Sequence, residues 1–150
     1  MTTQSLPAAA KTSITISLDS LASATYVAGT AVDVSSIDPL DIIVEMAVVQ
    51  TATASSGNKR TQVFIQTSLD GTNYSTGPTS GTTTTDEPDL YKIGDVPCNV
   101  ASTTHRKAFS VLAAIGWVPP YFKLICHNDL GTALSTGCTA HYTTVTGNSA

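Results

Sequence analysis

The sequence predicts an all-β protein: a single antiparallel β-sandwich of jelly-roll-like type with an extended N-terminal arm. Apolar residues alternate with polar residues along most segments, as in strands that bury one face. Clusters of Gly, Pro, Asn, Asp and Ser separate these segments. No segment between them has the length and period of a crossover helix, which parallel strands would require.

The chain begins with a segment that lacks a periodic pattern. Residues 1–11 contain Pro7 and a run of alanines and predict a flexible arm, and residues 12–150 predict the sandwich domain. The first strand is expected in residues 12–18, where Ile14, Ile16 and Leu18 alternate with Ser and Thr.

The two clearest strands follow in the first half of the chain. Residues 41–51 predict a long central strand with Glu45 on its outer face and four apolar residues on its inner face: Ile42, Val44, Met46 and Val48. Residues 60–68 predict a strand with Val63 and Ile65 inside and with Gln62, Phe64 and Gln66 outside.

Further strands are expected in residues 25–34, 89–96, 106–115, 120–128 and 134–146. The stretch AFSVLAAIG, within residues 106–115 and just beyond, could also be helical. Its β-forming residues and the nearby Pro119 and Pro120 favour a strand. Residues 79–88, rich in Thr, predict an exposed loop between strands.

The composition excludes several classes of partner. Charged residues make up 12% of the 150 residues, the formal net charge is -4 and the pI is near 5.0. Such a chain offers no positive field for phosphates, so we expect no binding to nucleic acid or to an anionic membrane. The N-terminus lacks the pattern of a secretory signal, and no apolar run approaches a membrane span.

The three cysteines predict reduced thiols rather than a disulfide framework, because their number is odd. A bridge between Cys126 and Cys138 remains an alternative. Zinc is a weak hypothesis: Cys126 and His127 are adjacent, and Cys138 and His141 also fall on opposite faces of a strand. We expect no metal and no cofactor.

Asp70 and Gly71, in the stretch SLDGTNY, predict a two-residue hairpin turn. The stretch differs from the Asp-box of sialidases, because Asp70 and Gly71 are adjacent and Tyr74 comes one position early. It also occurs once, whereas a propeller repeats it. A calcium site would need more carboxylates nearby, and none follow before Asp86.

No catalytic motif is present in the sequence, and we expect no enzymatic activity. There is no Gly-x-Ser-x-Gly elbow and no glycine-rich phosphate loop. The acidic cluster of Asp86, Glu87 and Asp89 lies in an expected loop that would not hold two carboxylates at a fixed separation. Trp117, Tyr121 and Phe122 could form a sugar-stacking platform, but packing in the core or at its rim is favoured.

Three phrases occur in a characteristic order: AGTAVDV, then the stretch from Leu40 to Tyr74 with its Ser-x-Asp-Gly turn, then the stretch from Val118 to Thr144. In the last, a Pro-aromatic-basic strand at 120–123 precedes a turn at Gly131. Over residues 28–146 the chain thereby resembles the capsid decoration, or cement, proteins of tailed bacteriophages, which have a β-sandwich of jelly-roll type.

The resemblance implies a non-enzymatic structural protein of the virion. It would be made in the cytoplasm of the host bacterium, bind the outer capsid surface, and clamp neighbouring major capsid subunits. Its partners would be the major capsid protein and itself, with a homotrimer favoured over a homodimer. Two alternatives stay open: another structural component of the tail or head–tail junction, and a β-sandwich module that binds a host glycan.

The N-terminal segment is the expected contact with a partner. Leu6 and Pro7 could occupy a groove on a neighbour, and Ile14 and Ile16 could add a strand to a partner's sheet. Alternatively, Ile14 and Ile16 belong to the first strand of the domain's own core.

Overall fold

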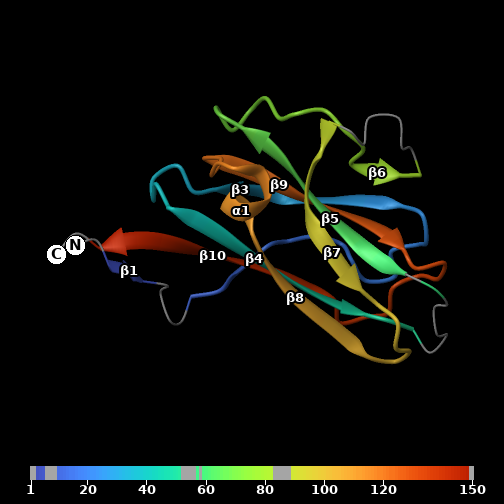
Figure 1. The fold of residues 1–150 in the computed structure, drawn as a ribbon. Helices are drawn as coiled ribbons and strands as arrows, with labels where there is room; N and C mark the ends of the chain where they lie inside the picture. The colour runs from blue at the N-terminus through green and yellow to red at the C-terminus, as the bar shows by residue number, and fades with distance from the viewer. Residues whose placement is uncertain (1–2, 6–9, 52–56, 58, 83–88, 149–150) are drawn as a thin grey trace.

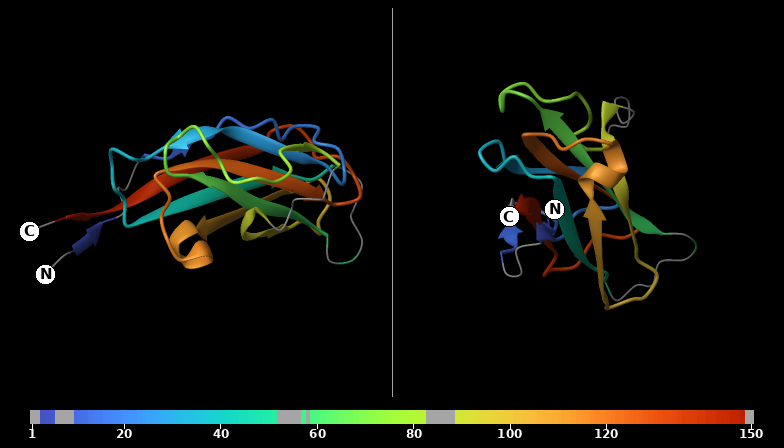
Figure 2. Two further views of the ribbon diagram at one scale, coloured as in Figure 1. Left: turned by 90° about the horizontal axis from the view of Figure 1, so that it is seen from above. Right: turned by 60° about the vertical axis from the view of Figure 1, so that its left-hand side comes forward.

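The computed structural model describes residues 3–5, 10–51, 57, 59–82 and 89–148. These residues form two antiparallel sheets packed face to face, which confirms the predicted sandwich (Figures 1 and 2). The first sheet contains β1 (Thr3–Ser5), β10 (Thr139–Asn148), β4 (Asp41–Val49) and β8 (Thr104–Ser110), with β2 (Thr12–Ser13) also paired to β10. The second contains β6 (Ser80–Gly81), β3 (Tyr26–Asp33), β9 (Tyr121–Asp129), β5 (Arg60–Ser68) and β7 (Tyr91–Pro97).

The order of the strands is that of a jelly roll. Without the short strands β1 and β6, the two sheets have the orders β2-β10-β4-β8 and β3-β9-β5-β7. The chain changes sheet at every connection among these eight strands except that between β5 and β7, which pair with each other. Alternation between two packed sheets is the feature that distinguishes this fold from a meander.

The core lies between the two sheets and has the expected phase in β4 and β5. Four residues of β4 are fully buried: Ile42, Val44, Met46 and Val48. Val63 and Ile65 of β5 are also fully buried, and both belong to the same apolar cluster. The alternation of apolar residues therefore correctly predicted which side of these strands faces the partner sheet.

The outer face of β5 differs from the prediction, because Phe64 and Gln66 on that face are buried as well. Phe64 is 2% exposed and forms a second apolar cluster with Tyr26, Leu90 and Ile125. The chain between β5 and β7 passes along this sheet to reach β6, which pairs with β3 (Figure 1). A residue from this connection, Leu90, helps to cover the sheet.

Residues 106–115 are not one strand, as predicted, but the end of β8 followed by the helix α1 (Val111–Ile115). The Ser110 hydroxyl caps the helix by accepting from the Ala113 N–H at 3.0 Å, and Gly116 ends it at a φ of 83°. Asp41 of β4 accepts from both Ser110 Oγ and the Leu112 N–H. Among the described residues, no helix has the length and apolar character needed to cross a membrane.

Two other predicted strands are shorter than expected. Only Thr12 and Ser13 of residues 12–18 pair in a ladder, although Ile14 and Leu18 still point into the core. In residues 134–146, Leu134 makes an isolated bridge with Gln50 and the strand itself begins at Thr139. Burial alternates through residues 14–18 but not through residues 134–146, and the backbone pairs over only part of each segment.

The described part of the N-terminal arm lies along the chain's own last strand. Residues 3–5 pair with residues 146–148 of β10, beyond the point at which β4 begins. The first and last described strands are therefore neighbours at one end of the sandwich (Figures 1 and 2).

We expect Ile65→Asp to prevent folding, because it places a charge without a partner at a fully buried position. The cost, about 5 kcal/mol or more, is comparable to the whole free energy of unfolding of a small domain. Circular dichroism and thermal unfolding measure this. The control is Val100→Asp, at a residue that is 57% exposed, which should change stability by less than about 0.5 kcal/mol. A cooperatively folded Ile65→Asp protein would refute the assigned strand phase.

Candidate interaction surface

The loop that follows β5 is organised by the carboxylate of Asp70. Its oxygens accept from the backbone N–H groups of Thr72 and Asn73, both at 2.8 Å, and from Asn73 Nδ2 at 2.7 Å. Ser68 Oγ donates to it at 3.0 Å. These hydrogen bonds, that of the Asn73 backbone first among them, hold the pKa of Asp70 well below its ordinary value. Asp70 therefore has a structural role in this loop.

This loop is a turn, but not the predicted two-residue hairpin. Gly71 has a φ of 72°, whereas a type I′ turn would also require a positive φ at Asp70, which does not have one. The chain next meets β5 at Ser75, whose N–H donates to the Thr67 carbonyl at 3.0 Å. The strand after the loop, β6, then pairs with β3 rather than with β5.

The same loop packs against the beginning of β9. A Cβ added to Gly71 would lie 3.0 Å from two carbons of the Tyr121 ring, so only glycine fits here without a shift. Three residues further on, the Tyr74 ring lies 4.2 Å from the Lys123 ammonium. The Ser-x-Asp-Gly stretch and the Pro-aromatic-basic stretch, two of the motifs on which the resemblance rests, therefore form one structural unit.

Two of the residues considered for zinc, Cys126 and His127, lie on opposite faces of their sheet. Cys126 is fully buried in the core, while His127 lies on the outer face, where it stacks on Tyr26 and hydrogen-bonds to Gln62 at 2.8 Å. No group of three or more His, Cys, Asp or Glu side chains that could hold a metal ion occurs in the part of the chain that the structure describes.

All three cysteines are free thiols. Burial raises the pKa of Cys98, Cys126 and Cys138, so each favours the protonated form. A protonated, buried thiol is a poor nucleophile and a poor metal ligand.

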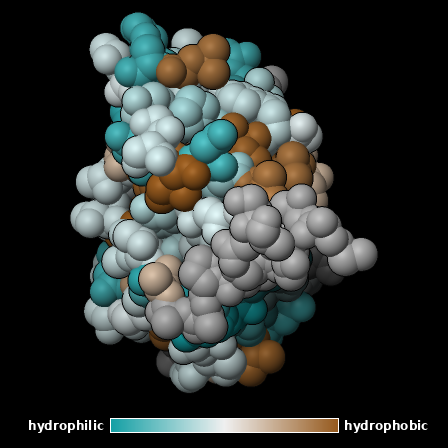
Figure 3. Space-filling model, turned by 90° about the vertical axis from the view of Figure 1, so that its left-hand side faces the viewer, coloured by the Kyte–Doolittle hydropathy of each residue, from teal (hydrophilic) through white to brown (hydrophobic). Residues whose placement is uncertain are grey.

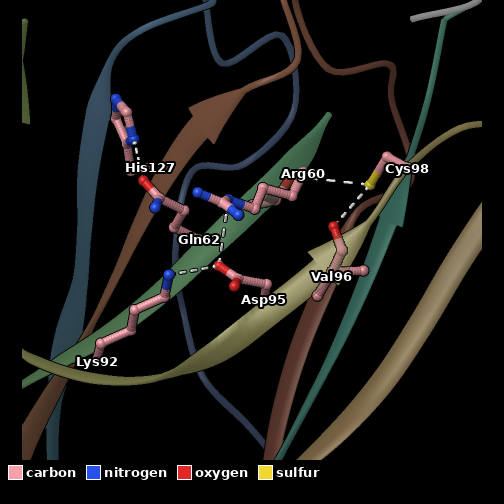
Figure 4. A network of polar contacts seen from close by, with 8 residues as sticks. Arg60, Gln62, Lys92, Asp95, Val96, Cys98 and His127 are labelled. Carbon is pink, nitrogen blue, oxygen red and sulfur yellow. Dashed lines mark hydrogen bonds and ion pairs between the residues drawn. The ribbon is translucent and has the colours of Figure 1, made fainter. Parts of the chain in front are cut away.

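A polar network lies on the outer face of β5, β7 and β9 (Figure 4). Asp95 forms ion pairs with Lys92 at 2.9 Å and with Arg60 at 3.7 Å, beside the hydrogen-bonded Gln62 and His127. The Asp95 ion pairs are partly exposed, so they contribute little to stability. The Nδ1 atom of the imidazole is paired with the side-chain amide of Gln62.

The remaining chemical candidates have different surroundings. Asp86 and Glu87 lie outside the described residues, and Asp89 accepts from Thr76 Oγ1. Phe122 is fully buried. Tyr121 packs on the Asp70 loop. Trp117 lines a surface pocket, of about 380 Å³, beside Leu69 and Asp70.

The four residues predicted to bind a partner have different positions. Leu6 and Pro7 lie outside the described residues. Ile14 is 3% exposed and belongs to the chain's own core, and Ile16 is half-buried against the same core. For these isoleucines the structure therefore matches the alternative in which they stabilise the domain itself.

Exposed apolar side chains gather instead at the end of the sandwich where the first and last described strands are neighbours. We name this surface the apolar end and define it by three loops: residues 34–40, 69–74 and 111–120. Among the described residues, six large hydrophobic side chains are exposed, and four of them belong to the apolar end: Ile37, Leu40, Leu69 and Leu112. Figure 3 looks onto this end and shows groups of hydrophobic residues interspersed with hydrophilic ones.

The sequence contained a signal for this surface. Ile37 and Leu40 interrupt the turn cluster SSIDPLD, and Leu69 directly precedes Asp70 and Gly71. Large apolar residues inside turn clusters have no strand partner to cover them, so they are candidates for exposure. The convergence of these loops, however, depends on the pairing of distant strands.

Comparison with known proteins identifies no relative. No protein-family model matches the chain, and neither does any curated protein or solved structure.

We expect Gly71→Ala to destabilise the fold more than Gly81→Ala does. Both glycines have a positive φ, near 70°, but an added Cβ meets the Tyr121 ring at residue 71 and open space at residue 81. The backbone cost shared by both variants is about 1 kcal/mol. The contact with Tyr121 should add about 1 kcal/mol or more in Gly71→Ala. The free energy of unfolding of both variants is measured by urea denaturation. An equal decrease in the two variants would show that the contact between Gly71 and Tyr121 does not stabilise the loop.

We expect Asp70→Ala to lower the melting temperature at pH 7. The pKa of Asp70 is lower in the folded chain than in the unfolded chain, so its carboxylate stabilises the fold above an ordinary pKa of about 4. This contribution is lost as the pH falls towards the folded-state pKa. The difference in melting temperature should therefore narrow between about pH 4 and about pH 2. A difference that stays constant over this range would contradict a role for the charge.

Proposed function

We propose that the chain is a non-enzymatic structural protein of a phage virion that binds the outer capsid surface and stabilises the shell by clamping neighbouring major capsid subunits. The observation that carries the proposal is the packing of the two motifs against each other. Gly71 lies on Tyr121 and Tyr74 lies over Lys123, so the residues behind the resemblance act together in this fold. They lie beside the exposed side chains of the apolar end.

The surface chemistry supports a binding role. Two of the candidate metal ligands are kept apart, with Cys126 inside the core and His127 outside it. Clamping on a lattice requires only a modest interface per copy, about 800 Å² on each partner, because many sites act together. Four exposed apolar side chains at one end supply the beginning of such an interface.

Binding of a host glycan is a second candidate function, favoured by one observation. Trp117 lines a pocket of about 380 Å³ together with Asp70 and Asn73, and an aromatic face beside polar groups is suited to a sugar. The oxygens of Asp70 already accept hydrogen bonds within the loop, which leaves them less available to a ligand. The capsid role is therefore the first to test.

The direct test is co-sedimentation with shells assembled from the major capsid protein of the same genome, followed by image reconstruction of the pellet. Saturable binding at fixed lattice positions on the outer surface is the expected result. A protein that stays in the supernatant at every shell concentration would refute the capsid role. Binding to tails or to head–tail junctions alone would indicate the alternative virion component.

Deletion of residues 1–11 should weaken shell binding by about tenfold or more, because it removes Leu6 and Pro7 as well as β1. The same deletion should leave binding to a glycan unchanged. Circular dichroism must first show that the shortened chain keeps its β fold. Undiminished shell binding by a folded variant would show that the N-terminal segment is no part of the clamp.

A further inference from the structure

We propose that the apolar end docks onto a partner protein whose surface combines apolar side chains with lysine or arginine, and not onto the same end of a second copy. This inference deepens the proposed function, on which it rests for taking the capsid shell as the natural partner. It assigns the surface that faces the shell and the chemistry that the shell must present there.

The apolar end exposes several large apolar side chains to solvent. Leu69 is 77% exposed, and Ile37, Leu40 and Leu112 are each between 41% and 44% exposed. Single exposed apolar residues are ordinary, but four on converging loops are a feature of interaction sites. The other two exposed hydrophobic residues, Tyr91 and Val100, lie outside these loops.

The surface of the apolar end is hollowed. Two pockets adjoin the segment 117–120, which separates the other two loops. One, of about 220 Å³, lies between this segment and the loop that contains Val34 and Pro39. The other, of about 380 Å³, lies between Trp117 and Leu69. Adjacent hollows bordered by apolar side chains can receive protruding side chains of a partner.

The loops of the apolar end carry acidic side chains. Four aspartates lie in the loops or at their borders: Asp33, Asp38, Asp41 and Asp70. Residues 33–41, 67–74 and 110–121 contain no lysine or arginine. The nearest cation along β9, Lys123, lies against the Tyr74 ring. The charged side chains of these loops are therefore of one sign.

Local hydrogen bonds lower the pKa of two of these carboxylates, those of Asp33 and Asp70. Ser35 donates to Asp33 through both its N–H and its hydroxyl, at 2.9 and 2.7 Å, and this lowers the pKa of Asp33. The pKa of Asp70 is lowered in the same way by Asn73. Both side chains are exposed, so their charge is presented to solvent.

The charge selects the occupant. Docking of two copies through this end would bring like charges together around the apolar contact, which is unfavourable. A partner that carries Lys or Arg around apolar side chains complements both properties. This is why we infer a different protein rather than a second copy.

The chain provides its own reporter for the test, because Trp117 is its only tryptophan and lines one of the two pockets. The full-length protein is titrated with an amphipathic helical peptide made of Leu and Lys, and with a matched peptide of Leu and Glu. We expect a saturable shift of the Trp117 emission with the Leu/Lys peptide alone, weakened by added salt. An equal response to both peptides, or to neither, would overturn the inference.

Variants locate the binding. The double variant Ile37→Ser, Leu40→Ser should bind the Leu/Lys peptide about tenfold or more weakly than wild type. Asp38→Lys should weaken peptide binding to a similar extent. Val100→Ser removes a comparably exposed apolar side chain outside this surface and should stay within about twofold of wild type. If Val100→Ser and the double variant lose the same amount of peptide affinity, the apolar end is not the binding site of the peptide. Sedimentation velocity without peptide tests the other occupant: self-association abolished by Asp38→Lys would overturn the inference.

Shell binding separates the two proposals. If wild type binds shells and the double variant binds them equally well, the capsid role stands and the assignment of this surface fails. If wild type binds no shell but binds the Leu/Lys peptide as expected, the surface stands and the capsid role fails.

Discussion

The structure depends on the position of β9 between β3 and β5. Its ladders run along both edges, and Leu124, Ile125 and Cys126 in its middle are all fully buried. A strand that is covered on both faces and paired on both edges has no freedom to change register, because a slip of one residue would exchange its two buried faces. The rest of the second sheet is aligned by this strand.

The register of β9 also builds the surface of interest. Tyr121, at its beginning, is the partner of Asp33 at the end of β3 and of Ser68 at the end of β5. Two loops that leave these strands and the segment that enters β9 are thereby brought to one end of the sandwich. Asp41, the first residue of β4, accepts hydrogen bonds from Ser110 Oγ and from the Leu112 N–H. These bonds attach α1 to the same end of the sandwich.

The remaining surface is arranged differently. On the first sheet, Glu45 forms ion pairs with Lys11 at 2.7 Å and with Arg106 at 2.8 Å. These contacts lower the pKa of Glu45, and the hydrogen bond from Lys11 has the largest effect. Arg106 and Lys107 lie on β8, an edge strand among the described residues, where charge hinders pairing with another sheet. Charge balance on the sheets contrasts with the acidic loops at the apolar end.

The sequence by itself determined the fold class and the phase of its main strands. Alternation placed Met46 and Ile65 inside, because a strand has a side-chain period of two and one face must be buried. It did not determine what depends on distant segments. Phe64 is buried because a connection far along the chain covers it, and α1 forms because Asp41 and Ser110 meet across the sheet. The Asp-Gly loop packs on Tyr121, a contact that the local sequence does not reveal, and the apolar end exists only because tertiary pairing brings separate loops together.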